Sequence, residues 1–125
     1  MLDVEQPKHS VFIVEDEPII AIMLEEMIKE IGWTVRAISL TKQDAIAKAR
    51  NLDCDVAIID LELNGEVSYD IARLLKQRGI PLCFATGHSA ENRPAELSNV
   101  PAIHKPFDEL ELRSTVEGLL SASGA

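Results

Sequence analysis

The chain has 125 residues, 46% of them hydrophobic, which is enough for one domain that we expect to span 1–125, with a core at about 10–121 and loose ends. Its formal net charge of −9 argues against electrostatic binding to nucleic acid or to an anionic membrane. No stretch is apolar enough to span a bilayer and Met1–Ser10 does not resemble a signal peptide, so we expect a cytoplasmic protein.

The N-terminal part of the chain predicts a buried strand followed by a helix. The apolar run at 11–14 predicts the strand, and Pro18, which follows three acidic residues, marks the first turn of a helix that ends at Gly32. Apolar residues at helical spacing predict the face of this helix that packs in the core: Ile20, Met23, Leu24, Met27 and Ile31.

The next elements are predicted to be an edge strand, a capped helix and a central strand. Residues 33–38 alternate between apolar and polar side chains, as an edge strand does. Thr41 and Asp44 resemble a capping box, and the helix that follows stops near Asn51, with Ala45, Ile46 and Ala49 packed inside. The apolar residues at 56–59, which lead into Asp60, predict a strand at 56–60 that is buried on both faces.

A turn, a third helix and a fourth strand come next. Asn64-Gly65 predicts the turn, and apolar residues within 71–75 mark the helix. Residues 81–85 predict a buried strand. Cys54 and Cys83 lie in or beside apolar runs without a paired spacing, so we expect reduced cysteines of the core rather than a disulfide or a metal site.

The last part of the chain predicts an irregular helix, a short strand and a final helix. Pro94 makes any helix within 90–99 short or irregular. Residues 101–104 predict a strand, and Asp108 and Glu111 have the spacing of a helix cap. The buried face of the final helix is predicted to comprise Leu112, Val116, Leu119 and Leu120. Alternating strands and helices predict a parallel sheet covered on both faces.

Polar residues follow four of the predicted strands, and in a parallel sheet those ends share one edge. The residues are Glu15, Asp16, Asp60, Thr86 and Lys105. Three clustered carboxylates repel one another unless a cation lies among them, and oxygen ligands suit Mg²⁺. Such an ion beside a free carboxylate, a hydroxyl and an ammonium is an arrangement for phosphoryl transfer to Asp60.

The motifs at these strand ends are highly specific in combination: Glu15-Asp16, Asp60, Thr86 and Lys105-Pro106-Phe107. From about residue 10 to residue 120, the chain resembles the response-regulator receiver domains, the CheY-like family. The resemblance implies a flavodoxin-like (βα)5 fold, α/β in class, with a doubly wound five-stranded parallel sheet in the order 2-1-3-4-5. It also implies a phosphoacceptor of a two-component or phosphorelay system, whose only chemistry is its own phosphorylation and dephosphorylation.

The resemblance implies a role for each site residue. Asp60 would accept a phosphoryl group from a phosphohistidine on a sensor histidine kinase or a histidine phosphotransfer protein, and would contact Mg²⁺. Asp16 would bind Mg²⁺ directly and Glu15 through a water, and the backbone carbonyl of Glu62 would be the remaining protein ligand. Lys105 would pair with the phosphoryl group.

Switching is expected to depend on the fourth and fifth strand ends. In the family pattern, Thr86 would hydrogen-bond a phosphoryl oxygen and move its loop, and the peptide after Lys105 would be a cis Lys-Pro bond. Phe84-Ala85-Thr86-Gly87, without an output domain, resembles a subfamily of stand-alone receivers. Partners are expected to be the phosphodonor and a downstream protein, with the chain a monomer or a weak dimer.

Three positions depart from the family pattern. Asn64-Gly65-Glu66 stands where a proline is usual, so we expect a more mobile loop. Ala102 stands where many receivers have an aromatic switch, so coupling between Thr86 and an aromatic side chain is not expected in that form. We interpret His88 as a solvated loop residue, with a substitute switch as the alternative.

Two other functions stay open. The first is a phosphorylation-independent protein-binding module, in which the acidic site serves mainly folding. The second is a hydrolase with an aspartate nucleophile, similar to the haloacid-dehalogenase-type phosphatases. The pattern at the nucleophile of those enzymes is Asp-x-Asp, whereas in this chain the residue two positions after Asp60 is Glu62. The chain is also short for a domain that would cover a substrate.

Overall fold

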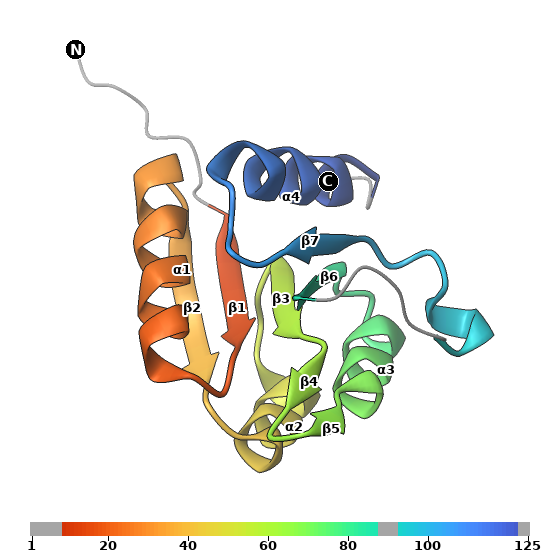
Figure 1. The fold of residues 1–125 in the computed structure, drawn as a ribbon. Coiled ribbons are helices and arrows are strands. Elements are labelled where there is room, and N and C mark those ends of the chain that lie inside the picture. Colours follow the sequence, from red (N-terminus) through yellow and green to blue (C-terminus); the bar gives the residue numbers. More distant parts are fainter. Residues whose placement is uncertain (1–8, 88–92, 123–125) are drawn as a thin grey trace.

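The computed structural model describes residues 9–87 and 93–122. Five parallel strands form its central sheet in the order β2-β1-β3-β6-β7 (Figure 1). The strands are β1 (Ser10–Val14), β2 (Thr34–Ser39), β3 (Val56–Asp60), β6 (Leu82–Thr86) and β7 (Ala102–His104). In sequence order of the five, this is the predicted 2-1-3-4-5 arrangement, with β3 at the centre and β2 at one edge.

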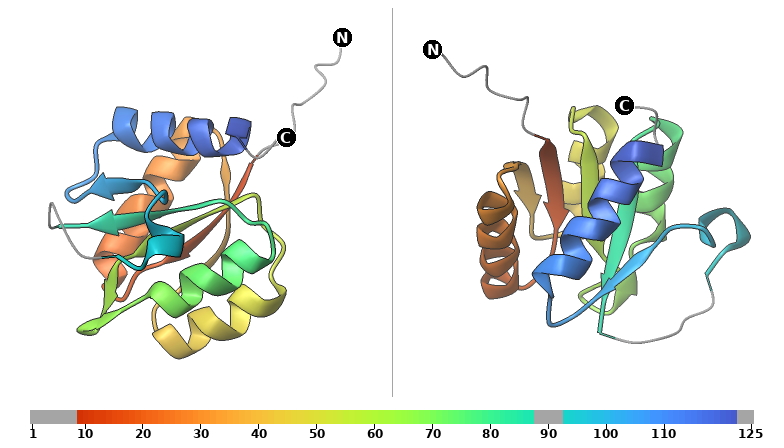
Figure 2. Two further views of the ribbon diagram at one scale, coloured as in Figure 1. Left: turned by 90° about the vertical axis from the view of Figure 1, so that its right-hand side faces the viewer. Right: turned by 90° about the horizontal axis from the view of Figure 1, so that it is seen from above.

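Four α-helices cover the sheet in two layers, as predicted. They are α1 (Pro18–Ile31), α2 (Lys42–Asn51), α3 (Tyr69–Gln77) and α4 (Glu109–Ala122). Helices α1 and α4 pack on one face and α2 and α3 on the other (Figure 2). No helix among the described residues is long and apolar enough to cross a membrane.

Each face of the sheet has its own hydrophobic core. Alternate residues of β1 and β3 point to opposite faces, so that Val11, Ile13, Val56 and Ile58 meet α1 and α4, and Phe12, Val14, Ala57 and Ile59 meet α2 and α3. These strands are buried along their whole apolar length. Both cysteines are free, with Cys83 buried in the core and Cys54 partly buried, as predicted.

The predicted helix ends are confirmed by the hydrogen bonds that close them. Pro18 is the first residue of α1, and Gly32 ends it in the left-handed region at φ 103°. The hydroxyl of Thr41 accepts a hydrogen bond from the amide of Asp44 at 3.1 Å. The carboxylate of Asp108 accepts one from the amide of Glu111 at 3.0 Å.

The predicted buried face of α1 is wrong at Met23, which is 51% exposed. The residues of α1 that are fully buried against the sheet are Ala21, Leu24 and Ile28. This phase turns the adjacent apolar residues outward, and Ile19 and Ile22 are 73% and 55% exposed. Hydrophobic spacing alone did not distinguish the two faces, because both carry apolar residues.

In its described part, residues 93–99, the segment predicted as a short or irregular helix holds one 3₁₀ turn, Ala95–Leu97. Pro94 precedes it in an extended conformation, with ψ of 148°. Leu97 is fully buried in the core shared with α3. Residues 88–92, and with them His88, lie outside the described residues.

The loop after β3 forms a small antiparallel hairpin, β4 (Glu62–Leu63) and β5 (Glu66–Val67). The predicted turn at Asn64-Gly65 is confirmed, and both residues have positive φ, 51° and 84°. Two positive φ angles in a two-residue hairpin loop are typical of a type I′ turn, which Asn-Gly favours. The hairpin is therefore paired where we expected a mobile loop.

Candidate functional site

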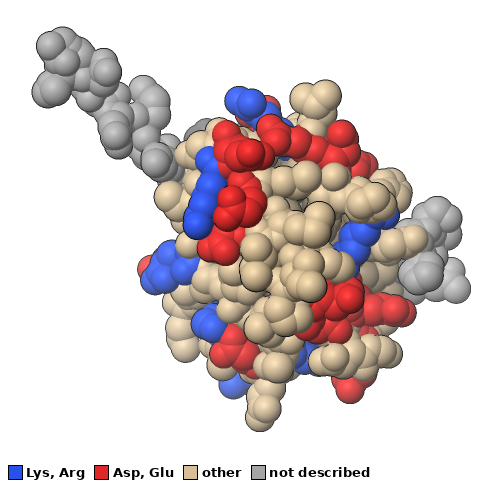
Figure 3. All heavy atoms as spheres, turned by 60° about the vertical axis from the view of Figure 1, so that its left-hand side comes forward, with Lys and Arg blue, Asp and Glu red and all other residues tan. Residues whose placement is uncertain are grey.

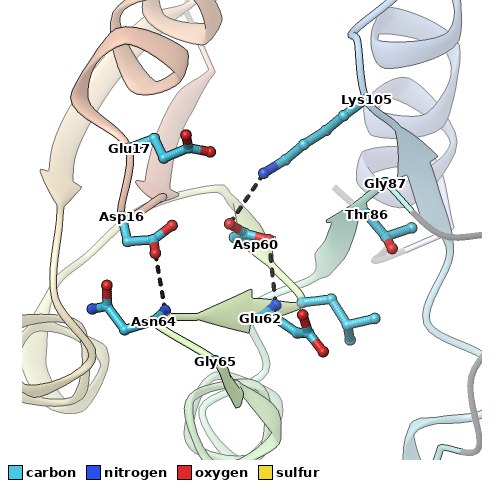
Figure 4. A pocket seen from close by; sticks show the side chains of 10 residues that line it. Asp16, Glu17, Asp60, Glu62, Asn64, Gly65, Thr86, Gly87 and Lys105 are labelled. Carbon is cyan, nitrogen blue, oxygen red and sulfur yellow. Dashed lines mark hydrogen bonds and ion pairs between the residues drawn. The ribbon is translucent and has the colours of Figure 1, made fainter.

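The strand ends bring the predicted polar residues to one edge of the sheet. An open pocket of about 310 Å³ lies there, and it is lined in part by Asp16, Asp60, Thr86 and Lys105. Asp60 is the last residue of β3 and Thr86 the last of β6, so the central strands deliver both. The side chains of Asp16, Asp60 and Lys105 point toward one another (Figure 4).

Three carboxylates converge at this edge. One oxygen each from Glu15, Asp16 and Asp60 lies within 4.8 Å of the others, which is close enough for all three to ligate one cation. Glu15 is 1% exposed and does not belong to the lining of the pocket. Oxygen ligands of this kind fit a hard divalent cation such as Mg²⁺.

Lys105 reaches into the carboxylate cluster from the end of β7. Its Nζ lies 2.7 Å from Oε1 of Glu15 and 3.1 Å from Oδ2 of Asp60. The peptide bond between Lys105 and Pro106 is cis, as expected. The ammonium thus neutralises part of the negative charge at the two most buried carboxylates.

Burial and hydrogen bonding shift the pKa values of these groups. Burial raises the pKa of Glu15 to about 7, against the opposing effect of the hydrogen bond from Lys105. Burial likewise raises the pKa of Asp60. Burial also acts to raise the pKa of Asp16, but hydrogen bonds, led by that from the amide of Asn64, lower it overall. The two buried carboxyl groups, Glu15 and Asp60, therefore ionise less readily than exposed ones. A bound cation would favour their ionised forms.

The main chain around Asp60 is fixed by contacts that sequence reasoning missed. The hydroxyl of Ser68, which is fully buried, donates to the carbonyl of Asp60 at 2.7 Å. The amide of Glu62 donates to Oδ1 of Asp60 at 3.3 Å. Ser68 follows the Asn-Gly turn by a few residues, but only the tertiary fold shows that its hydroxyl faces the end of β3.

The carbonyl of Glu62, which the family resemblance assigned to the metal, is not used by the hairpin ladder. Paired residues in an antiparallel ladder alternate between hydrogen-bonded and non-hydrogen-bonded positions. The amide of Ser68 donates to the carbonyl of Leu61, which places Glu62 and Val67 at a non-hydrogen-bonded position. The carbonyl of Glu62 is thus left available for another ligand.

Thr86 lines the pocket and is buried. On the adjacent strand, Ala102 pairs with Phe84 of β6. Because residue 102 is alanine, no aromatic side chain occupies this position of β7. Instead, the guanidinium of Arg93 lies 5.1 Å above the ring of Phe84, and the ring of Tyr69 meets it edge-on at 6.1 Å. This stack was missed, since no local pattern pairs Arg93 with β6.

An apolar area adjoins the pocket on the α1 side. A second pocket of about 300 Å³ is lined by Ile20, Met23, Lys105, Pro106 and Phe107. The exposed side chains of Ile19 and Ile22 are on the same helix. Figure 3 shows an uncharged area between groups of acidic residues on this side of the molecule. We call Ile19, Ile22, Met23, Pro106 and Phe107 the α1 patch.

Comparisons with known proteins agree with the geometry of the site. The family model described as "Response regulator receiver domain" matches residues 11–117. The probable transcriptional regulatory protein TcrX of Mycobacterium tuberculosis is 29% identical over 120 residues, which cover 92% of this chain and 51% of that protein. This chain therefore spans about half the length of the curated relative it matches.

Several solved structures are similar over most of the chain. The solution structure of SdrG from Sphingomonas melonis Fr1 has 34% sequence identity and a TM-score of 0.78, covering 90% of this chain and 97% of that one. The response regulator PhyR from Brucella abortus has 26% identity and a TM-score of 0.79, covering 95% of this chain and 50% of that one.

Proposed function

The chain belongs to the family of response-regulator receiver domains, and we propose that it takes a phosphoryl group from a phosphohistidine onto Asp60 in a two-component or phosphorelay system. The observation that carries this proposal is the convergence of Asp60 with two further carboxylates and with Lys105 Nζ, 3.1 Å away. We expect no chemistry beyond the protein's own phosphorylation and dephosphorylation.

Each site residue has a separate role in the proposed phosphoryl transfer. Glu15, Asp16, Asp60 and the carbonyl of Glu62 would hold Mg²⁺, which supplies positive charge for the phosphoryl oxygens. An oxygen of Asp60 forms the new P–O bond as the P–N bond of the phosphohistidine breaks. The electron pair of that bond stays on the imidazole nitrogen of the donor. The ammonium of Lys105 then pairs with the phosphoryl group instead of with the carboxylate of Asp60.

Thr86 is proposed to respond to phosphorylation of Asp60 by forming a new hydrogen bond. Its hydroxyl lies in the pocket lining beside Gly87, at the start of the connection from β6 to β7. A hydrogen bond from Thr86 to a phosphoryl oxygen would draw this connection toward Asp60. Phe84 lies opposite Ala102 in the sheet and is stacked by Arg93, and this stack would be disturbed by the movement.

The α1 patch supports a protein as the phosphodonor. Exposed apolar residues grouped beside a polar reaction site mark a surface for another macromolecule rather than for a small phosphoester. A phosphohistidine on a helical partner could reach Asp60 while the apolar residues of that partner cover the patch. The stand-alone assignment and the cytoplasmic location stay predictions.

Linked binding of Mg²⁺ and a phosphoryl mimic tests the proposal. With both beryllium fluoride and Mg²⁺ present, we expect amide resonances of Asp60, Thr86 and Lys105 to shift together. Because linkage is reciprocal, each ligand should bind more tightly in the presence of the other. Binding of beryllium fluoride that is the same in EDTA and in Mg²⁺ would contradict the proposal.

A second function, a phosphorylation-independent protein-binding module, is favoured by one observation. The ammonium of Lys105 pairs with both Glu15 and Asp60, so the acidic site is partly neutralised from within the chain. In that case beryllium fluoride and Mg²⁺ should leave the affinity for a partner protein unchanged. An affinity that changes several-fold would exclude the module.

A further inference from the structure

The β4–β5 hairpin contacts the carboxylate cluster through its turn. The main-chain amide of Asn64 donates to Oδ2 of Asp16 at 2.9 Å, across 48 positions in the sequence (Figure 4). A carboxylate has two oxygens, so this bond orients Asp16 and leaves Oδ1 for a cation. Asn64 belongs to the lining of the pocket, together with Gly65.

The turn conformation makes this amide available. Leu63 and Glu66 are the paired residues that close the two-residue loop, so the amide of Asn64 is outside the ladder. Among the described residues, Asn64 is the only non-glycine residue with positive φ. Asn tolerates the left-handed region better than most residues, and Gly65 adopts it without strain.

The far strand of the hairpin is held by Lys42, from the first turn of α2. Its Nζ lies 3.1 Å from Oε1 of Glu66 and 3.2 Å from Oδ2 of Asp70, and it also donates to the carbonyl of Val67 at 3.4 Å. Lys42 therefore ties the hairpin to α2 and to the start of α3. It contacts none of the three clustered carboxylates.

We propose that the β4–β5 hairpin is a positioning element of the cation site: the Asn64 amide holds Asp16 in the orientation that ligates the ion, and Lys42 holds the hairpin in place. The proposal rests on the proposed function, in which Asp16 is a direct ligand. Asn64 and Lys42 act through Asp16 and not on the phosphoryl group.

The backbone role of the turn can be separated from the side chain of Asn64. Asn64→Gly keeps the amide and favours positive φ, so the affinity for Mg²⁺ alone, measured by isothermal titration calorimetry, should stay within about twofold of wild type. Asn64→Val places a β-branched residue at positive φ and should weaken binding about tenfold, equivalent to about 1.4 kcal/mol.

Gly65 offers a matched pair of glycine substitutions. Apart from the adjacent residues and, for Gly118, the backbone of its own helix, no atom lies within 4 Å of the position that a Cβ would take at Gly65 or at Gly118, so alanine meets no clash at either site. Of these two glycines, only Gly65 has a positive φ, 84°. Gly65→Ala should therefore weaken Mg²⁺ binding several-fold, whereas Gly118→Ala in α4 should leave it unchanged.

Lys42→Met tests the same proposal without any backbone strain. If Lys42 acted only through its charge, its removal would strengthen binding of a cation. Positioning predicts the opposite, a loss of affinity of about threefold. Lys48→Met on the same helix is the control for charge, because Lys48 pairs with Asp44 and not with the hairpin.

The outcomes separate the two proposals. Wild type that binds Mg²⁺, with Asn64→Val, Gly65→Ala and Lys42→Met binding it equally well in the folded state, would overturn the positioning role and leave the proposed function standing. Weakening by Asn64→Gly to the level of Asn64→Val would overturn the backbone role. Wild type that binds no Mg²⁺ would overturn both proposals.

Discussion

The ammonium of Lys105 lies 2.7 Å from the carboxylate of Glu15, a residue 90 positions earlier in the chain. The Glu15 side chain is 2% exposed and that of Lys105 19% exposed, so this ion pair is largely shielded from water. The same Nζ reaches Asp60. One lysine thus links the first strand, the central strand and the last strand at the edge where chemistry is proposed.

Lys105→Met should destabilise the metal-free protein by about 1–3 kcal/mol, since two buried carboxylates lose their partner. Urea unfolding in EDTA measures the loss. Mg²⁺ should restore more stability to this variant than to wild type, because the ion takes over neutralisation. Lys29→Met, which removes an exposed pair with Glu25, is the control and should cost less than about 0.5 kcal/mol. Equal losses in the two variants would contradict the account.

The pH dependence of stability follows from Glu15. Burial raises the pKa of Glu15 from 4.5 to about 7 in the folded protein, so between these values the folded state binds more protons than the unfolded state. Stability in EDTA should therefore fall as the pH rises from about 4.5 to about 7. Asp60, whose pKa is also raised, acts in the same direction. Urea midpoints across this range should show the slope, and Glu15→Gln should reduce it.

Mg²⁺ binding should have the opposite pH dependence. A cation prefers ionised carboxylates, so its affinity should increase as the pH rises through about 7, with release of protons. Calorimetric titrations in buffers of different ionisation enthalpy measure the number of protons released. An affinity that does not change between pH 6 and 8 would be inconsistent with Glu15 as a participant.

The α1 patch predicts a difference between protein and small-molecule phosphodonors. Ile22→Glu places a charge on a residue that is 55% exposed, so the fold should be unaffected. Phosphotransfer from a phosphohistidine protein should slow about tenfold, whereas labelling by acetyl phosphate should be unchanged. Ala47→Glu is the matched control, because Ala47 is exposed on α2, on the opposite face of the sheet. Equal slowing in both variants would exclude the patch as a docking surface.

Thr86→Ala should separate phosphorylation from switching. The acceptor Asp60 and its carboxylate neighbours are untouched, so labelling by acetyl phosphate should stay within a few-fold of wild type. The shift of amide resonances in the connection after β6, produced by beryllium fluoride, should be lost. If the amide resonances shift as fully in Thr86→Ala as in wild type, the Thr86 hydroxyl is not required for the change in this connection.

The parallel sheet and the residues at its carboxyl edge followed from local patterns, whereas the strand order came from the family resemblance. Short apolar runs ended in Asp16, Asp60, Thr86 and Lys105, and a parallel sheet allows those ends only one common edge. The helix caps at Thr41 and Asp108 were predictable for the same reason, because capping depends on residues within a single turn.

Features that depend on long-range packing were not predictable. Met23 was placed on the wrong face of α1, since the helix phase is chosen by the sheet that it meets. The hairpin was predicted only as a turn, because strands of two residues, Glu62–Leu63 and Glu66–Val67, are too short to show an alternating pattern. Ser68 contacts Asp60, eight positions earlier in the chain, and Arg93 stacks on Phe84 of β6; no sequence motif links either pair.

The central claim, that Asp60 is the phosphoacceptor, is tested most directly by intact mass after incubation with acetyl phosphate and Mg²⁺. Wild type should gain one phosphoryl group, and Asp60→Asn, folded and of nearly equal shape, should gain none. A phosphoryl adduct on Asp60→Asn, or no adduct on folded wild type with either acetyl phosphate or a phosphohistidine donor, would contradict the claim.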